Sequence, residues 1–396
     1  MNTFTYLYPV KIYFGKGCAD GAIKAELAKV GKHVLFAFGG GSVKKTGLYE
    51  RIHTLLKDAG KTVTDFGGIM PNPTYAKVQE GACLVREHKI DFILAVGGGS
   101  VIDACKIVSA QSLLPDGMDI WEYEYSERKL PTEFVPMGAV VTASGTGAEN
   151  NNGAVITHEE KKLKAPLWGA FADFAVLDVD VTATVPFKQT VSGAFDTLSH
   201  AMETYFGTTG EAQLTNLSDE ISESVMRSTI RNIRVLLSHP DSSDPENETA
   251  RSELMWASAM AENGILKIGK TTDFQCHMIE HQLGAYTDCN HGMGLSAIHP
   301  ALYRHMMPEA NPQFARMAVE VWGVDPAGKT EAVLAEAFVD SLAAFIKEIG
   351  MPSTLGEMGI TDENILRAVA DTSVLTPGCC KKLSREEIFE LLKESM

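Results

Sequence analysis

Five side chains that commonly bind metal ions fall in two short stretches of the sequence. His277 and His281 are four residues apart, so a helix would place both imidazoles on one face. Asp196 and His200 have the same spacing in another helical pattern. His291 follows in a Cys-Asn-His-Gly segment, which we expect to be a loop that folds back toward the first pair. Together these residues predict a site for one divalent metal ion.

The types of donor atom narrow the choice of metal but leave one ligand open. Three neutral imidazole nitrogens and one carboxylate oxygen suit Fe²⁺, Zn²⁺ or another divalent transition metal, with a free position for substrate. Spacing alone does not decide between His277 and His281. One such histidine pair is common in ordinary helices, whereas two i, i+4 pairs and a further histidine favour a metal site.

Composition limits the class of protein. The chain has 396 residues, of which 45% are hydrophobic and 22% charged, as expected for a globular protein of two domains. A net charge of −16 argues against a nucleic-acid partner and against docking on an anionic membrane. The N-terminus lacks a signal-peptide pattern, and no apolar run reaches about 18 residues. Seven cysteines without a Cys-x-x-Cys motif fit reduced thiols, so we expect a cytoplasmic protein.

The first half of the chain alternates apolar strands with helices, which predicts an α/β domain with a mostly parallel sheet over residues 1–185. The expected strands are Lys11–Phe14, His33–Phe38, Thr62–Phe66, Asp91–Val96, Phe134–Thr142 and Ala175–Leu177, and the helices between them are Ala19–Val30, Tyr49–Ala59, Thr74–His88 and Val101–Leu113. After Pro186 long helical patterns predict an all-α domain over 186–396. Its expected helices are Gly193–Tyr205, Leu214–Leu237, Thr249–Ile268, Phe274–Leu283, Gln313–Val321, Lys329–Ile349 and Arg385–Glu394.

A Gly-Gly-Gly-Ser segment separates one of these strands from its helix. Without side chains, Gly97, Gly98 and Gly99 let backbone N–H groups approach an anion, and the helix that follows Ser100 adds its dipole. The segment is neither Gly-x-Gly-x-x-Gly nor a P-loop, so the pyrophosphate of a dinucleotide fits better than a transferable phosphate. The alternative is an ordinary glycine-rich turn.

A second such segment bears on the choice of dinucleotide. Gly39, Gly40, Gly41 and Ser42 end the strand His33–Phe38, and Lys44 and Lys45 follow them in the sequence. No carboxylate is present between positions 34 and 48 to hold a ribose 2′-OH. The loop therefore favours NADP(H) over NAD(H). The alternative is a loop with two solvated lysines.

Several motifs spread over nearly the whole chain carry a family resemblance. They are Phe14-Gly-Lys-Gly17, Gly39-Gly-Gly-Ser-Val-Lys-Lys-Thr-Gly47, Pro71-Asn-Pro73, Ala95-Val-Gly-Gly-Gly-Ser-Val-Ile-Asp103, Thr142-Ala-Ser-Gly-Thr-Gly-Ala-Glu149, Asp196-x-x-x-His200, and His277-x-x-x-His281 with His291-Gly292. The chain resembles the iron-dependent (group III) alcohol dehydrogenases, above all the butanol dehydrogenase and NADPH-dependent aldehyde reductase subgroup.

The resemblance implies a Rossmann-like first domain and the overall architecture of dehydroquinate synthase-like enzymes. It also selects the metal ligands, which fall on Asp196, His200, His277 and His291. His281 is left near the nicotinamide and the substrate, as a catalytic candidate. The implied reaction is reversible hydride transfer between NAD(P)H and a small aldehyde, such as butanal, or the matching primary alcohol. The implied assembly is a homodimer.

The resemblance also implies contacts with the dinucleotide. The pyrophosphate falls on Gly97 to Ser100, and Thr142 and Thr146 would lie along the cofactor. Asp103, at the end of the Gly-Gly-Gly-Ser motif, is a cofactor-binding and catalytic candidate. Lys164 resembles a lysine that reaches the cofactor ribose.

Two other classes of function compete with a dehydrogenase. A metal-dependent lyase or cyclase of the dehydroquinate synthase type would need several Lys and Arg near the ligands to hold a phosphorylated acid. Few basic residues lie close to the ligand motifs within 187–290, which disfavours this class. A metal-free binding or sensory protein is disfavoured because all four ligand types are present.

Overall fold

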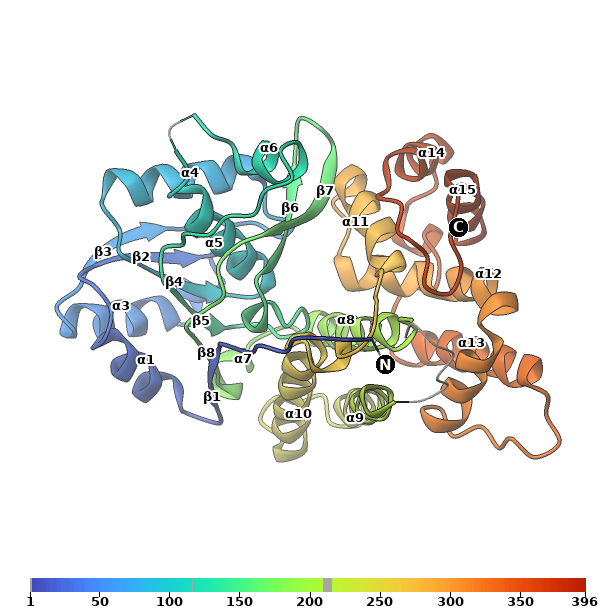
Figure 1. Cartoon of the computed structure of the whole chain (residues 1–396). Helices are drawn as coiled ribbons and strands as arrows, with labels where there is room; N and C mark the ends of the chain where they lie inside the picture. Colours follow the sequence, from blue (N-terminus) through green and yellow to red (C-terminus); the bar gives the residue numbers. More distant parts are fainter. Residues whose placement is uncertain (1, 116, 209–215) are drawn as a thin grey trace. The chain divides into compact units, whose positions relative to one another are not determined.

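A computed structural model of the chain describes residues 2–115, 117–208 and 216–396. These residues form two compact units, Leu7–Pro186 and Met1–Tyr6 with Phe187–Met396. The first is an α/β unit and the second is helical, so the predicted fold class is confirmed. Figure 1 labels the elements, and each unit is described by itself.

A six-stranded sheet forms the centre of the α/β unit, in the order β1-β8-β5-β4-β2-β3. Every pairing in it is parallel. Its strands are β1 Lys11–Phe14, β2 His33–Phe38, β3 Thr62–Phe66, β4 Phe92–Gly97, β5 Met137–Val141 and β8 Phe174–Leu177. The central strands β4, β5 and β8 are buried at every position, because helices cover both faces of the sheet, and this explains their uninterrupted apolar sequences.

Helices α1 and α3 cover one face of this sheet and α4 and α5 cover the other (Figure 1). The helices of the unit are α1 Ala19–Leu27, α2 Ser42–Lys45, α3 Leu48–Asp58, α4 Tyr75–Glu87, α5 Gly99–Gln111, α6 Ile120–Tyr125 and α7 Val179–Thr182. The four-residue helix α2 occupies part of the predicted glycine-rich loop. The six strands and helices α1, α3, α4 and α5 agree with the predicted elements to within a few residues at each end, whereas α6 and α7 were not predicted.

An antiparallel hairpin was missing from the predicted elements. It consists of β6 Gly153–His158 and β7 Leu163–Trp168 and forms a separate two-stranded sheet. Buried and half-buried positions alternate along β6, as expected for a strand with one face on a core. Asp103 fixes the hairpin to α5, because its Oδ2 accepts the Val155 N–H at 2.9 Å.

The second unit consists of α-helices around one apolar core. They are α8 Phe187–Tyr205, α9 Leu217–Ser238, α10 Pro245–Glu262, α11 Gln275–Thr287, α12 His291–Glu320, α13 Glu331–Glu348, α14 Glu363–Thr372 and α15 Arg385–Glu394. Phe206, Tyr303, Phe314 and Phe338 form an aromatic cluster in this core, with ring centroids 4.7–5.9 Å apart. The first residues of the predicted helix Leu214–Leu237 lie outside the described residues.

Two predictions around the histidines were wrong. Helix α11 does not end at Leu283 but continues to Thr287. His291 does not lie in a loop, because it is the first residue of the 30-residue helix α12, capped by the Asn290 side chain. Three prolines inside α12 disrupt its sequence pattern, and only its end, from Gln313 onward, was predicted. In the described part of the chain, no helix is long and apolar enough to cross a membrane.

Candidate functional site

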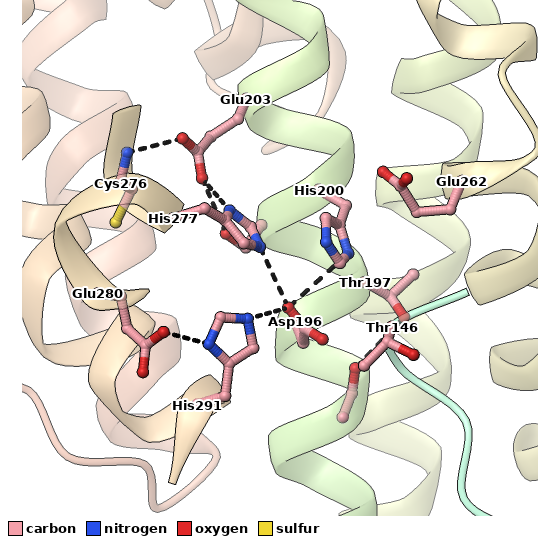
Figure 2. A network of polar contacts seen from close by, with 12 residues as sticks. Thr146, Asp196, Thr197, His200, Glu203, Glu262, Cys276, His277, Glu280 and His291 are labelled. Atoms are coloured by element: carbon pink, nitrogen blue, oxygen red, sulfur yellow. Dashed lines mark hydrogen bonds and ion pairs between the residues drawn. The ribbon is translucent and has the colours of Figure 1, made fainter. Parts of the chain in front are cut away.

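The Asp196 carboxylate lies at the centre of the predicted metal ligands (Figure 2). Its Oδ1 atom is 3.4 Å from His277 Nε2, 3.4 Å from His291 Nε2 and 3.7 Å from His200 Nδ1. Asp196 and His200 share one face of α8, whereas His277 comes from α11 and His291 from α12. The structure therefore brings the four residues together from the consecutive helices α11 and α12 and from α8, which is distant from them in the sequence.

The polar atoms of this cluster fit a metal ion better than they fit one another. Asp196 Oδ1, His200 Nδ1 and His277 Nε2 are buried, and within the described residues none of them has a hydrogen-bond partner. Buried polar atoms are normally satisfied, so three convergent exceptions need a ligand. One carboxylate and three imidazoles form the N₃O donor set that divalent transition metals accept.

The charges of the clustered side chains also favour a bound metal ion. Burial opposes ionisation of Asp196, but the neighbouring His200 and His291 hold the pKa of its carboxyl well below the ordinary value. Burial likewise disfavours a charged His277, yet the Glu203 and Asp196 carboxylates raise its pKa to about 10. The pKa of His200 is lowered, mainly by burial. The buried carboxylates thus draw positive charge into the site, which a divalent cation would supply.

Two further carboxylates contact the outer nitrogens of the histidines. Glu203 accepts a hydrogen bond from His277 Nδ1, and Glu280 accepts one from His291 Nδ1 (Figure 2). Both histidines consequently direct Nε2 toward Asp196. Neither glutamate was among the predicted site residues. Each follows a histidine of the site by three residues, in His200-Ala-Met-Glu203 and His277-Met-Ile-Glu280, but this spacing does not identify the histidine that the glutamate bonds.

His281 lies beside the cluster but outside its centre. Its ring centroid is 5.4 Å from that of His291 and 5.9 Å from that of His277. The side chain is buried and belongs to the same helix, α11, as His277. Of the two histidines that spacing left open, His277 is the one that points at Asp196.

The two glycine-rich segments of the α/β unit follow neighbouring strands, β2 and β4. The chain leaves β2 toward β3 on one side and leaves β4 toward β5 on the other, so the strand order reverses between them. Such a switch point, at the carboxyl ends of the strands, is where open α/β sheets bind their ligands. Gly39–Ser42 and Gly97–Ser100 both lie at that edge.

Close packing surrounds the second of these segments. Helix α5 begins at Gly99, which leaves its first N–H groups without partners inside the helix. A Cβ atom at Gly99 would lie 2.4 Å from Thr146 Oγ1, so glycine is required there and Thr146 lies directly beside the segment. Thr142 donates its backbone N–H to the Gly97 carbonyl at 3.0 Å. The predicted residues Gly97–Ser100, Thr142 and Thr146 are therefore neighbours.

Asp103 and Lys164 make contacts within the protein that the sequence did not suggest. Besides holding Val155, Asp103 forms an ion pair with the fully buried Lys106 at 3.5 Å. Burial raises the pKa of Asp103, and Lys106 offsets this only in part. Lys164 is buried on β7 and donates to Asn72 Oδ1 at 2.9 Å. Asp103 thus has a structural task in the hairpin, in addition to the roles predicted for it.

The two lysines after Gly39–Ser42 lie in different environments. The Lys44 ammonium lies over the rings of Phe38 and Tyr49, 5.2 Å and 4.9 Å from their centroids. Lys45 is exposed, and its Cε would lie 3.9 Å from a Cβ at Gly41. Of the two, Lys45 is the lysine beside the glycines.

Comparisons with known proteins agree with this geometry. The profile of iron-containing alcohol dehydrogenases matches residues 9–179, and that of the C-terminal region of the same family matches residues 190–396. The chain belongs to the iron-containing alcohol dehydrogenase family. It is 33% identical to NADH-dependent butanol dehydrogenase A of Clostridium acetobutylicum over the full length of both chains. It is also 33% identical to the NADPH-dependent aldehyde reductase YqhD of Escherichia coli, over 99% of this chain and 95% of that one.

Solved structures give the same family. The crystal structure of NADH-dependent butanol dehydrogenase A from Thermotoga maritima matches with a TM-score of 0.90 and 31% identity, over 100% of this chain and 99% of that one. The predicted family is therefore confirmed, and with it the predicted enzyme class, an NAD(P)-dependent alcohol dehydrogenase. Membership implies a metal ion and a nicotinamide cofactor.

The geometry makes a prediction that separates His277 from His281. His277→Ala removes an imidazole that points at Asp196, so we expect metal affinity to fall by more than about a hundredfold, beyond the usual loss for an outer-shell partner. His281→Ala leaves the four central residues intact and should retain stoichiometric metal. Metal content after dialysis against a buffered chelator measures both. Retention by His277→Ala together with loss by His281→Ala would reverse the assignment.

Proposed function

We propose that this family member reduces small aldehydes such as butanal with NADPH, and oxidises the matching primary alcohols, using Fe²⁺ held by Asp196, His200, His277 and His291. The observation that carries the metal assignment is the convergence of three imidazole nitrogens on Asp196 Oδ1, at 3.4–3.7 Å. Zn²⁺ or another divalent transition metal fits the same donors. We further propose that the enzyme is a cytoplasmic homodimer, as the family resemblance implies.

When bound, the cation supplies a Lewis acid for the carbonyl oxygen and the nicotinamide supplies the hydride. The chain positions both. Gly97–Gly99 let the backbone approach the pyrophosphate, and Thr142 and Thr146 lie next to those glycines. Asp196 is the carboxylate among the proposed ligands, so it balances part of the cation's charge.

We assign His281 the relay of the proton that completes the alcohol. Its ring adjoins that of the ligand His291, with a centroid separation of 5.4 Å. Imidazole is suited to this task because its ordinary pKa lies near neutrality. Lys164 on β7, which is 5% exposed, and Asp103 on α5, which is paired with the buried Lys106, are proposed to support the cofactor.

We propose NADPH as the preferred cofactor. The exposed Ser42 hydroxyl and the Lys45 ammonium lie beside glycines at the end of β2, with no carboxylate in this loop to repel a 2′-phosphate. Lys44 contributes less to this argument, because its ammonium lies over Phe38 and Tyr49. One of the two relatives is named as NADH-dependent and the other as NADPH-dependent. The preference of this enzyme is therefore tested by comparing its rates with the two cofactors.

Removal of the metal tests the Lewis-acid role. Because such an ion contributes several kcal/mol to the transition state, we expect demetallated enzyme to reduce butanal at least about a hundredfold more slowly. NADPH oxidation is followed anaerobically with and without chelator, and Fe²⁺ or Zn²⁺ is then added back. Recovery on addition excludes damage by the chelator. An unchanged rate in protein shown to lack metal would contradict the role.

Cofactor preference is tested with two aspartate variants. One charge-assisted hydrogen bond to the 2′-phosphate should give NADPH a kcat/KM about tenfold to a hundredfold above that of NADH. Gly39→Asp and Gly40→Asp should each reverse this order, by adding a 2′-OH acceptor and a repulsive charge. A Cβ at Gly39 would lie 3.3 Å from the Ile69 carbonyl oxygen, whereas space beside Gly40 is open, so Gly40→Asp controls for strain. A clear NADH preference in the unmodified enzyme would contradict the proposal.

A further inference from the structure

Glu203 and Glu280 link the three helices that carry the proposed metal ligands, α8, α11 and α12, in a crossed pattern. Each glutamate lies three residues after a ligand on its own helix but bonds a histidine on another element. Glu203 of α8 holds His277 of α11, and Glu280 of α11 holds His291 of α12 (Figure 2). The pattern therefore joins α8 to α11 and α11 to α12.

These bonds fix which nitrogen of each ring is available. A carboxylate can only accept, so Nδ1 of His277 and of His291 must carry a hydrogen. In the neutral ring Nε2 then holds the lone pair, and in both residues it is Nε2 that lies 3.4 Å from Asp196 Oδ1. Tautomer and ring orientation are thus set before any ion arrives.

Both glutamates are themselves held firmly. The side chain of Glu203 is 5% exposed and that of Glu280 is fully buried. The second Glu203 oxygen accepts the Cys276 backbone N–H at 2.7 Å. Glu280 packs against Gly294 of α12 so closely that a Cβ there would lie 2.8 Å from its Cγ and 2.9 Å from its Oε1. Gly294 therefore leaves the space that the Glu280 side chain occupies.

We propose that Glu203 and Glu280 are positioning residues, which hold His277 and His291 in the metal-binding tautomer and orientation and raise the affinity of the site. This inference rests on the proposed function, because it takes Asp196, His200, His277 and His291 as the ligands. Outer-shell partners of this kind are worth roughly tenfold to a hundredfold in metal affinity.

Two substitutions at each position separate hydrogen bonding from charge. Glu280→Gln keeps an oxygen that can accept from His291 Nδ1, whereas Glu280→Leu removes the acceptor; Glu203→Gln and Glu203→Leu do the same for His277. Affinity is measured by competition with a chelator for Zn²⁺, and ligand geometry by the visible absorption of the Co²⁺-substituted protein. We expect each leucine variant to bind Zn²⁺ about tenfold to a hundredfold more weakly and to show an altered Co²⁺ spectrum, with recovery in each glutamine variant.

Two further variants control for a general loss of packing. Glu223→Gln breaks another ion pair of the same unit, between the buried Glu223 and the half-buried Arg316 at 2.7 Å, without touching a proposed ligand. It should lower thermal stability and leave Zn²⁺ affinity unchanged. Gly294→Ala keeps every carboxylate but displaces that of Glu280, so it should weaken Zn²⁺ binding as Glu280→Leu does. It provides the same test if the leucine variants fail to fold.

The outcomes distinguish the two proposals. If the unmodified protein binds no Zn²⁺, or if His277→Ala binds it equally well, the proposed metal site is wrong. If the unmodified protein binds Zn²⁺ and His277→Ala does not, but Glu203→Leu, Glu280→Leu and Gly294→Ala keep the affinity and the Co²⁺ spectrum of the unmodified protein, the site stands and the positioning role is overturned.

Discussion

A buried carboxylate surrounded by imidazoles is the constraint on which the helical unit depends. Asp196 is 3% exposed, and its Oδ1 lies within 3.7 Å of nitrogens from three histidines. A charge in such a place costs several kcal/mol unless it is paired. Helices α8, α11 and α12 must therefore meet at one point, and the apolar core that packs them also fixes the positions of the proposed ligands.

A different constraint orders the α/β unit. Strands β2 and β4 are hydrogen-bonded neighbours, yet the chain leaves them toward opposite sides of the sheet. Glycines follow both strands, and at Gly99 the neighbouring Thr146 leaves no space for a side chain. The same residue type thus satisfies packing and leaves the backbone open to an anion. This double use explains why a glycine-rich turn and a phosphate-binding turn are hard to separate by sequence alone.

How well the sequence predicts an element or a site residue depends on whether the interactions that determine it are local in the sequence. The sheet was predictable because buried parallel strands are continuous apolar runs, as in Phe92–Gly97. The pair Asp196 and His200 was predictable because i, i+4 spacing is local, whereas the choice of His277 over His281 came from the family resemblance. The hairpin Gly153–His158 with Leu163–Trp168 was missed, since its strands are short and the first follows directly on the polar, asparagine-rich segment 149–152. The start of α12 was missed because prolines disrupt its periodicity, although Pro300, Pro308 and Pro312 are accommodated with a kink at Ala310.

Glu203 and Glu280 were missed for another reason. Their partners lie 74 and 11 residues away, and the sequence does not show that each bonds a histidine from another helix. A carboxylate three residues after a histidine is also a frequent pattern on solvated helix faces. Only burial distinguishes the two cases, and burial depends on how α8, α11 and α12 pack.

The backbone just before α11 shows how strictly that packing is imposed. Phe274 has φ 49° and ψ 47°, a left-handed conformation that is unfavourable for a bulky residue and costs about 1–3 kcal/mol. The preceding Asp273 is held by the Cys379 backbone N–H at 2.6 Å, and the Lys267 ammonium lies 4.8 Å from the centre of the Phe274 ring. With these contacts the ring packs edge-on against His200 and His277, at centroid distances of 6.0 Å and 5.5 Å.

A relaxed backbone at this point would release the ring from both imidazoles. The backbone strain is therefore located just before α11, beside the cluster of Asp196 and the histidines. The surrounding contacts compensate for it. Strained residues persist where neighbouring structure determines them, which is characteristic of functional sites. The left-handed Phe274, Glu203 and the central Asp196 all contact one histidine, His277. Three contacts therefore fix the position of that imidazole.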